Sequence, residues 1–425
     1  MPVYPRDKST HYVSSRSICG IVAPLSIAAP KAFTRPLCMP VYLRPQKYTG
    51  IQEHPFLDTW QIHAANPMAH PFIQQPINAK ETHMSNEAVN RQRRFLLGGA
   101  IAGVAAAELA FMGAAHAAAA RAGKPQQLGP IKQIKAGELD VGYYEAGPAD
   151  GVPVLLMHGY PYDIHSYAEV APLLAARGCR VIVPHLRGHG STRFLDSGNP
   201  RSAQQSAVAL DQIALLDALN IDRAVMVGYD WGARTACIIA ALWPERCLGL
   251  LSVNGYIMTN LPGNKLPLPA KAEHGWWYQY YFATERGRLG LEANRRDIAR
   301  ILWTTNSPKW AYDDATFERT AASFDNPDYV QIVIHNYRWR LSLADGFPKY
   351  AELEKRLATL PTIGVPTITM DGDSDGVVPA TDGKGYAAKF TGPRSHLIVN
   401  AGHNVPQEAP EAFADAVWKL ASARH

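Results

Sequence analysis

From residue 128 onward, short apolar runs alternate with longer amphipathic segments. The apolar runs lie at residues 154–157, 181–183, 224–227, 250–253, 367–370 and 397–399. Such near-continuous apolar runs are typical of strands that are buried on both faces of a parallel sheet. Between them, segments such as 209–219 carry apolar residues at helical spacing. The pattern predicts an α/β protein with a mostly parallel, doubly wound sheet.

Residues 259–345 interrupt this rhythm. They are rich in Trp, Tyr and Arg and contain no run typical of a buried strand. We predict a helical cap that is inserted between two core strands and divides the core into residues 128–258 and 346–425. In this architecture ligands bind outside the carboxyl ends of the strands, where such a cap would lie.

Residues 1–83 show no sustained period of two or of 3.6, so we expect a disordered or artefactual leader rather than a packed domain. Residues 84–120 differ, because a basic run is followed by an apolar, Ala-rich run, as in an export signal. Translation is then expected to start at Met84. Cleavage is expected near Ala117 and would release the mature protein to the periplasm or the medium.

The type of signal is indicated by Arg93-Arg94, which Phe95 follows directly. This run resembles a twin-arginine export signal, although a residue usually separates the arginine pair from the Phe. A Sec signal and a membrane-anchoring helix are the alternatives. Glu108 and the small Ala side chains favour a cleaved signal over an anchor.

Composition excludes several classes of function. The net charge is +5, but Lys and Arg are scattered and form no stripe with interleaved aromatic residues, so no nucleic-acid partner is expected. The five cysteines form no Cys-x-x-Cys pair, and we interpret them as small buried hydrophobes. Several histidines lack the spacing of metal ligands and are expected to be structural or surface residues: His158, His185, His189 and His396. No metal and no other cofactor is predicted.

The strongest local signal is the run Gly228-Tyr229-Asp230-Trp231-Gly232, which lies between a predicted strand and a predicted helix. In this context Gly-x-nucleophile-x-Gly forms a nucleophile elbow, a tight turn that lifts the central side chain above the sheet. The central residue here is Asp230. An Asp that only caps the following helix is the alternative interpretation.

Further motifs follow other predicted strands in an order that supports the elbow. Residues 158–161 (His-Gly-Tyr-Pro) and 187–192 (Arg-Gly-His-Gly-Ser-Thr) precede it, and residues 372–375 and 402–406 follow it. The last two segments supply Asp375 and His403, which gives the order nucleophile, acid, histidine. Asp375 is preferred as the acid because it lies past the strand end. Asp373 remains the alternative.

On these motifs, residues 128–425 resemble the epoxide hydrolase and haloalkane dehalogenase branch of the α/β-hydrolase superfamily. The motif at 187–192 and the aromatic run at 278–282 are closer to soluble epoxide hydrolases. In those enzymes two cap tyrosines bind the epoxide oxygen. The resemblance implies this role for Tyr278 and Tyr337, although the run around Tyr278 is also compatible with simple apolar filling of the cap.

The chemistry explains an Asp at the elbow. Attack of Asp230 on an sp³ carbon leaves an ester, which water activated by His403 can cleave, with Asp375 orienting the imidazole. The backbone N–H groups of Tyr160 and Trp231 are the expected oxyanion donors. The predicted function is opening of a small hydrophobic epoxide by water to a vicinal diol, without a cofactor.

Two alternatives stay open. A haloalkane or haloacid dehalogenase would share the triad and bind a halide. In haloalkane dehalogenases an indole N–H beside the nucleophile donates to the halide, and Trp231 has the matching position here. Arg234 is interpreted as a surface residue or a buried ion pair. A matching Arg helps to bind carboxylate in fluoroacetate dehalogenases, where the residue after the nucleophile is also Arg. The second alternative, a non-catalytic binding protein on this scaffold, would normally have lost a triad residue, and none is missing.

Overall fold

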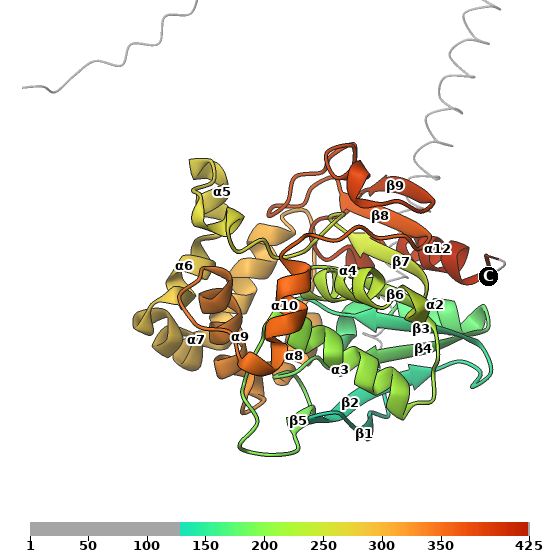
Figure 1. Cartoon of the computed structure of the whole chain (residues 1–425), viewed down its shortest axis with the longest axis horizontal. Helices are drawn as coiled ribbons and strands as arrows, with labels where there is room; N and C mark the ends of the chain where they lie inside the picture. The colour runs from blue at the N-terminus through green and yellow to red at the C-terminus, as the bar shows by residue number, and fades with distance from the viewer. Residues whose placement is uncertain (1–127, 424–425) are drawn as a thin grey trace, which may run out of the picture. The chain divides into compact units, whose positions relative to one another are not determined.

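A nine-stranded sheet forms the centre of the protein in this computed structural model, which describes residues 128–423 (Figure 1). The predicted leader and export signal lie outside these residues. The strands are β1 (Lys132–Ala136), β2 (Leu139–Ala146), β3 (Val152–Met157), β4 (Cys179–Pro184), β5 (Arg193–Phe194), β6 (Ala224–Gly228), β7 (Cys247–Val253), β8 (Thr367–Gly372) and β9 (Arg394–Val399). They lie in the order β1-β2-β4-β3-β6-β7-β8-β9, and β5 pairs with β2.

The sheet is parallel from β4 to β9 and antiparallel at its other end, where β2 pairs with β1, β4 and β5. All six predicted runs are strands of the parallel part, so the prediction of a mostly parallel sheet is confirmed. The prediction missed β1, β2 and β5. In β1 and β5 most side chains are at least partly exposed, so these strands lack the continuous apolar run that marks a buried strand.

Helices cover both faces of the sheet. On one face α3 (Gln205–Ala218) packs against α4 (Trp231–Leu242), and on the other α2 (Val170–Ala176) packs against α12 (Pro410–Ala421). The apolar side chains of β6 and of residues 154–157 in β3, which lie between these layers, are at most 1% exposed. Burial on both faces explains why the strand sequences are almost uninterruptedly apolar.

The segment between β7 and β8 is helical, and it contains the predicted cap at 259–345. Its helices are α5 (Ala270–Gly275), α6 (Trp277–Ala283), α7 (Glu285–Asn306), α8 (Asp314–Ala321) and α9 (Tyr329–Arg340), and α10 (Ala351–Leu357) leads back to the sheet. Figure 1 shows α5 to α9 grouped at one side of the sheet. The predicted helical insertion between two core strands is therefore present.

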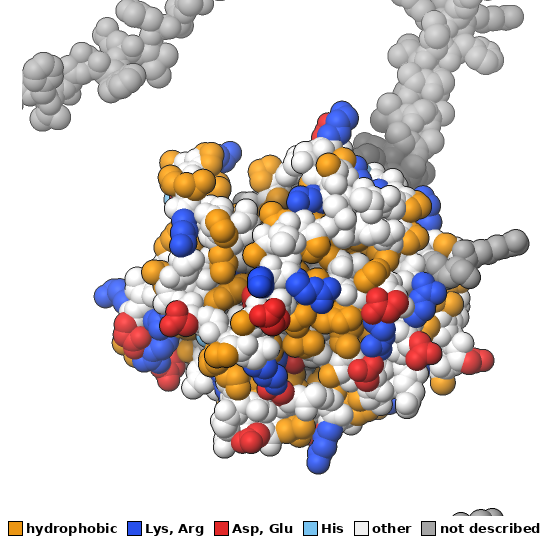
Figure 2. All heavy atoms as spheres, in the orientation of Figure 1, with side chains coloured by type: hydrophobic (Ala, Val, Ile, Leu, Met, Phe, Trp, Pro, Cys, Tyr) orange, Lys and Arg blue, Asp and Glu red, His pale blue; other side chains and the backbone are white. Residues whose placement is uncertain are grey.

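On the face drawn in Figure 2, basic and acidic side chains are interspersed. Ion pairs form on the cap surface, for example between Arg288 and Glu285. Near α5, hydrophobic side chains reach the surface, and Leu266 is 70% exposed. No helix within residues 128–423 is long and apolar enough to cross a membrane.

Candidate active site

Asp230 lies at a strained turn between β6 and α4. Its φ of 51° and ψ of −119° place an L-residue in the left-handed half of the conformational map, which is costly and typical of functional sites. A Cβ on Gly232 would collide with the carbonyl oxygen of Met157, so only glycine lets α4 approach β3 this closely. The Asp230 side chain makes no capping hydrogen bond to α4. The geometry is therefore that of a nucleophile elbow and not of a helix cap.

The two carboxylate oxygens of Asp230 have different neighbours. The Tyr160 N–H donates to Oδ1 at 2.7 Å, whereas Oδ2 lies 3.6 Å from His403 Nε2, longer than a direct hydrogen bond. Burial alone would raise the pKa of Asp230. The interaction with His403, the charge of Arg234 and the Tyr160 N–H outweigh burial and lower it. The carboxylate is thus ionised, with Oδ2 free of hydrogen bonds from the backbone.

His403 is held by the acid that the sequence favoured. Its Nδ1 lies 2.8 Å from Asp375 Oδ2, and Asp375 Oδ1 accepts the N–H groups of Val377 and Val378 at 2.7 and 2.9 Å. Burial would lower the pKa of His403, but the charges of Asp375 and Asp230 raise it to about 10. The alternative acid, Asp373, is 42% exposed at its side chain and faces Lys309 instead. The structure thus pairs Asp375 with His403.

Tyr278 of α6 and Tyr337 of α9 meet in the same buried region. Their ring centroids are 5.4 Å apart and their planes nearly perpendicular, and both rings contact that of Tyr160. Burial first, and then the charge of Asp230, raises the pKa of Tyr278 to about 12. Burial, Tyr278 and Asp230 likewise raise the pKa of Tyr337 well above its ordinary value. Both phenols therefore stay protonated and able to donate hydrogen bonds at neutral pH.

Of the two predicted oxyanion donors, only Tyr160 reaches Asp230 in this state. No hydrogen bond among the described residues joins the Trp231 N–H to the Asp230 carboxylate. Trp231 is the first residue of α4, and an N–H in the first turn of a helix has no partner within the helix. The backbone N–H of Trp231 is thus available to donate a hydrogen bond to an acceptor outside the helix.

Several buried donors beside the elbow have no hydrogen-bond partner within residues 128–423. They are Trp231 Nε1, Arg234 Nε, Asn336 Nδ2 and Arg340 Nε. Arg234 is buried, yet it makes no ion pair with a described carboxylate, so the predicted ion pair is absent. Burial and then the charge of Arg340 lower the pKa of Arg234 to about 10. Asn336 and Arg340, on either side of Tyr337, were missed because no local motif marks them.

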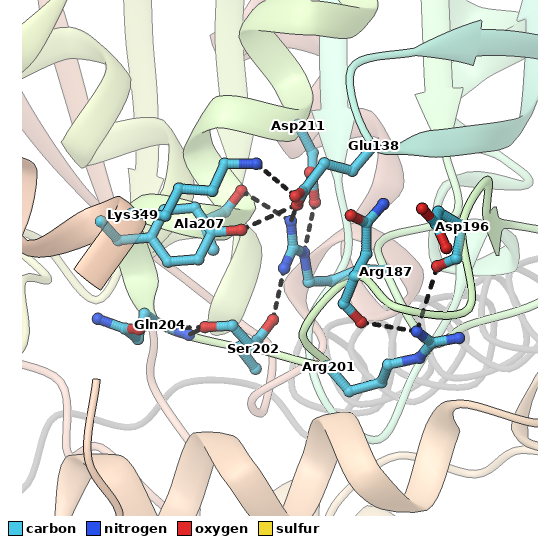
Figure 3. A network of polar contacts seen from close by, with 12 residues as sticks. Glu138, Arg187, Asp196, Arg201, Ser202, Gln204, Ala207, Asp211 and Lys349 are labelled. Carbon is cyan, nitrogen blue, oxygen red and sulfur yellow. Dashed lines mark hydrogen bonds and ion pairs between the residues drawn. The ribbon is translucent and has the colours of Figure 1, made fainter. Parts of the chain in front are cut away.

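Arg187, which begins the motif at 187–192, has a structural role. Arg187 is buried, and its Nε and Nη2 each lie 2.6 Å from the Asp211 carboxylate (Figure 3). Its Nη1 donates to the Ser202 carbonyl oxygen, and Glu138, which also pairs with Lys349, lies near its Nη2. These contacts tie the loop after β4 to α3 and to the chain that leaves the cap. They do not reach Asp230.

The remaining motif histidines are buried and neutral. Burial lowers the pKa of His158 to about 3 and of His185 and His189 to about 4. His158 Nε2 accepts the Leu186 N–H, which joins the loops after β3 and β4. Within residues 128–423, no cluster of His, Cys, Asp or Glu has the arrangement of a metal site.

Comparison with known proteins finds epoxide hydrolases among the relatives of this chain. Epoxide hydrolase B of Mycobacterium tuberculosis is 30% identical over 150 residues, which are 32% of this chain and 41% of that protein. Epoxide hydrolase A of the same organism is 27% identical over 306 residues, 65% of this chain and 92% of that protein. The chain spans 41% to 51% of the length of the first curated relatives that it matches.

A solved structure is more similar. A crystal structure of a Klebsiella pneumoniae protein, provisionally called an epoxide hydrolase, is 52% identical with a TM-score of 0.69. It matches 71% of this chain and 100% of its own. The model of the α/β hydrolase fold family matches residues 152–410, more than half of the 425 residues. The chain therefore belongs to the α/β hydrolase fold family and has epoxide hydrolase-like relatives.

Proposed function

We propose that this protein is a hydrolase that opens an epoxide to a vicinal diol through an ester on Asp230. One observation carries the proposal: a strained Asp presents one carboxylate oxygen to a backbone N–H and the other to an acid-supported histidine. A serine in this position would form an ether with an sp³ carbon, and activated water does not cleave an ether readily. The names of the relatives support the choice of an epoxide.

In the first half-reaction, Oδ2 of Asp230 attacks a ring carbon and the ring C–O bond breaks. Tyr278 and Tyr337 donate hydrogen bonds to the oxygen as negative charge develops on it. Their raised pKa values keep both hydroxyls protonated for this purpose. The product is an alkyl ester of Asp230.

In the second half-reaction, water attacks the carbonyl carbon of that ester. His403 Nε2 takes the proton of the water, and Asp375 stabilises the imidazolium. The oxyanion forms on Oδ1, where the Tyr160 N–H already donates and the Trp231 N–H adds a second hydrogen bond. Collapse breaks the bond between the carbonyl carbon and the substrate oxygen. That oxygen takes the remaining proton of the added water, which releases the diol, restores the Asp230 carboxylate and leaves His403 protonated.

The protons balance between the two halves. In the free protein the charge of Asp230 helps to raise the pKa of His403 to about 10, so the ring carries a proton. Formation of the ester removes that charge, and the pKa of His403 falls. The opened alkoxide takes the proton that the imidazolium loses. The neutral imidazole is then the base for the second half-reaction. Charge on Asp230 thus controls when His403 can act.

A second candidate, hydrolysis of a haloacid, is favoured by the unpaired donors. Arg234 and Arg340 are neighbouring cations without a described carboxylate partner, and Asn336 adds an unpaired amide N–H. Two arginines match the carboxylate of such a substrate. The cavity lined by Trp231, Arg234 and Asn336 holds only about 10 Å³, so side chains would have to move to admit a ligand.

A substrate panel tests the two candidates. Purified residues 121–425 are incubated with neutral epoxides, haloalkanes and 2-haloacids, while diol and halide are measured. Diol formation from neutral epoxides supports the proposed function. Halide release without any epoxide turnover would move the protein to the dehalogenases, and a preference for acids over neutral haloalkanes that Arg340→Met removes would identify the arginines as the carboxylate site.

We also propose that residues 84–120 direct export and are cleaved near Ala117. The order of basic, apolar and small residues supports this. Mass spectrometry of the exported protein measures the new N-terminus. An intact precursor as the sole exported form would contradict the proposal.

A further inference from the structure

The end of the cap helix α7 lies between the loops that carry Asp375 and His403. The carbonyl oxygen of Asn306, the last residue of α7, accepts the Gly376 N–H at 2.9 Å and the His403 N–H at 3.3 Å. Ser307 Oγ accepts the same His403 N–H at 3.0 Å. One end of one helix therefore binds the backbone of both loops.

A partly buried carboxylate, Glu408, completes this connection. It lies at the end of α11 (Val405–Glu408) and accepts hydrogen bonds from Ser307 Oγ at 2.6 Å, the Gly402 N–H at 2.7 Å and the Asn404 N–H at 3.1 Å. Together Ser307 and Glu408 engage the N–H groups of three consecutive residues, with His403 in the middle. The imidazole is thus fixed at its backbone as well as at Nδ1.

The close approach of α7 requires glycine in both loops. A Cβ on Gly376 would collide with the carbonyl oxygen of Thr305, and one on Gly402 would lie 2.6 Å from Ser307 Cα. Real Cβ atoms do not approach other atoms this closely. The two loops are therefore shaped to receive the helix end, which is a built contact and not incidental packing.

We propose that Ser307 and Glu408 are positioning residues that hold His403 in line for the attack of water on the ester. This role rests on the proposed two-step function. Neither side chain contacts Asp230 or the tyrosines, and both reach the chemistry only through the histidine loop. In that mechanism His403 acts in the second half-reaction. Loss of either contact therefore slows hydrolysis of the ester and spares its formation.

The test separates the two half-reactions in the full chain. Ser307→Ala and Glu408→Gln are mixed with an epoxide that the parent protein hydrolyses, and the ester on Asp230 is followed by mass spectrometry after rapid quenching. We expect the rate of ester formation to stay within about twofold. Ester hydrolysis should fall about ten- to a hundredfold, the cost of misplacing a catalytic group by about an ångström. The ester then accumulates, and kcat and KM fall together.

A matched control is present in the same chain. Glu354 of α10 is also a partly buried carboxylate that accepts a Ser hydroxyl and a backbone N–H, both from Ser206. Desolvation raises the pKa of Glu354 as it does that of Glu408. Glu354 does not touch the histidine loop. Glu354→Gln should lose comparable stability without accumulating ester, and Ser307→Thr, which keeps the hydroxyl, should recover ester hydrolysis.

Three results would overturn the positioning role. They are equal slowing of both half-reactions in Ser307→Ala, unchanged ester hydrolysis in that variant, and ester accumulation in Glu354→Gln. Ser307→Ala removes only one oxygen, so it keeps the test valid if Glu408→Gln does not fold. Failure of the proposed function is a separate result, because then His403→Gln itself traps no ester.

Discussion

The core and the cap contribute opposite kinds of group to the candidate active site. The core supplies Asp230, His403 and Asp375, each from a loop at a strand end and each bound to another triad residue or a backbone N–H. Beside Tyr337, the cap supplies Asn336 and Arg340, whose donors lack partners. Groups that have hydrogen-bond partners are held in place for bond making, whereas buried donors without a partner can bind a ligand. We therefore expect the core loops to carry the reaction, and the cap, together with Trp231 and Arg234 of α4, to recognise what reacts.

The largest effect on activity is expected when the nucleophile of the core, Asp230, is replaced. Asp230→Asn keeps the shape of the side chain but removes the charged nucleophile, so we expect kcat/KM to fall by about three orders of magnitude or more. Steady-state turnover of the best epoxide measures this, and circular dichroism controls for folding. Near-normal turnover would exclude the Asp230 ester.

The next effect separates the two core roles. His403→Gln removes the base while Asp230 can still attack, so turnover should stop after the first half-reaction. Intact-protein mass spectrometry should show the mass of one substrate added to the protein. Digestion should then locate the added mass on the peptide that contains Asp230. A variant that turns over without a trapped adduct would disprove the two-step mechanism.

The same comparison explains how far the sequence alone could lead. Buried parallel strands carry a strong apolar signal, and catalytic loops follow their ends. Local motifs therefore predicted Asp230 and His403, which the structure brings together. The sequence favoured Asp375 over Asp373 only by its position past the strand end, and the folded loop shows which carboxylate faces the imidazole.

The cap offers no equivalent signal. Helical packing decides which of its many aromatic residues meet, and only the family resemblance indicated the pair Tyr278 and Tyr337. The link from Ser307 to Glu408 joins residues that are 101 positions apart, and neither belongs to a motif that sequence analysis singled out. Contacts of this kind follow from tertiary structure and cannot be predicted from periodicity or from short motifs.

A smaller effect is expected from the cap half. Tyr278→Phe and Tyr337→Phe each remove a hydroxyl that donates chiefly as charge develops, so each should lower kcat for epoxides by about ten- to a thousandfold. Ring packing is retained, and the loss of stability should be about 1 kcal/mol, that of one hydrogen bond. The double variant should have almost no epoxide turnover. Full activity in that variant would refute the tyrosine assignment, whereas surviving halide release would sharpen the division between core and cap.

The smallest effect concerns the pH dependence of stability, which the charges of the core half should control. The pKa of His403 is raised in the folded protein from 6.5 to about 10. The folded protein therefore binds this proton more tightly than the unfolded protein does. This stabilisation is fully present below about pH 6.5 and is lost as pH rises toward 10. The pKa values of Asp230 and Asp375 are lowered instead, so their contribution is present above their ordinary value of 3.8 and is lost as pH falls through the lowered values.

The triad should therefore stabilise the protein most between about pH 4 and 6.5. Urea unfolding of the parent protein and of His403→Gln, measured from pH 6 to 10, isolates the part that belongs to His403. The parent should lose more stability than the variant as pH rises. His165, whose pKa is also raised, titrates in both proteins and cancels in the difference. Parallel pH profiles would mean that His403 is neutral in the free protein, and the control of its basicity by the Asp230 charge would then be wrong.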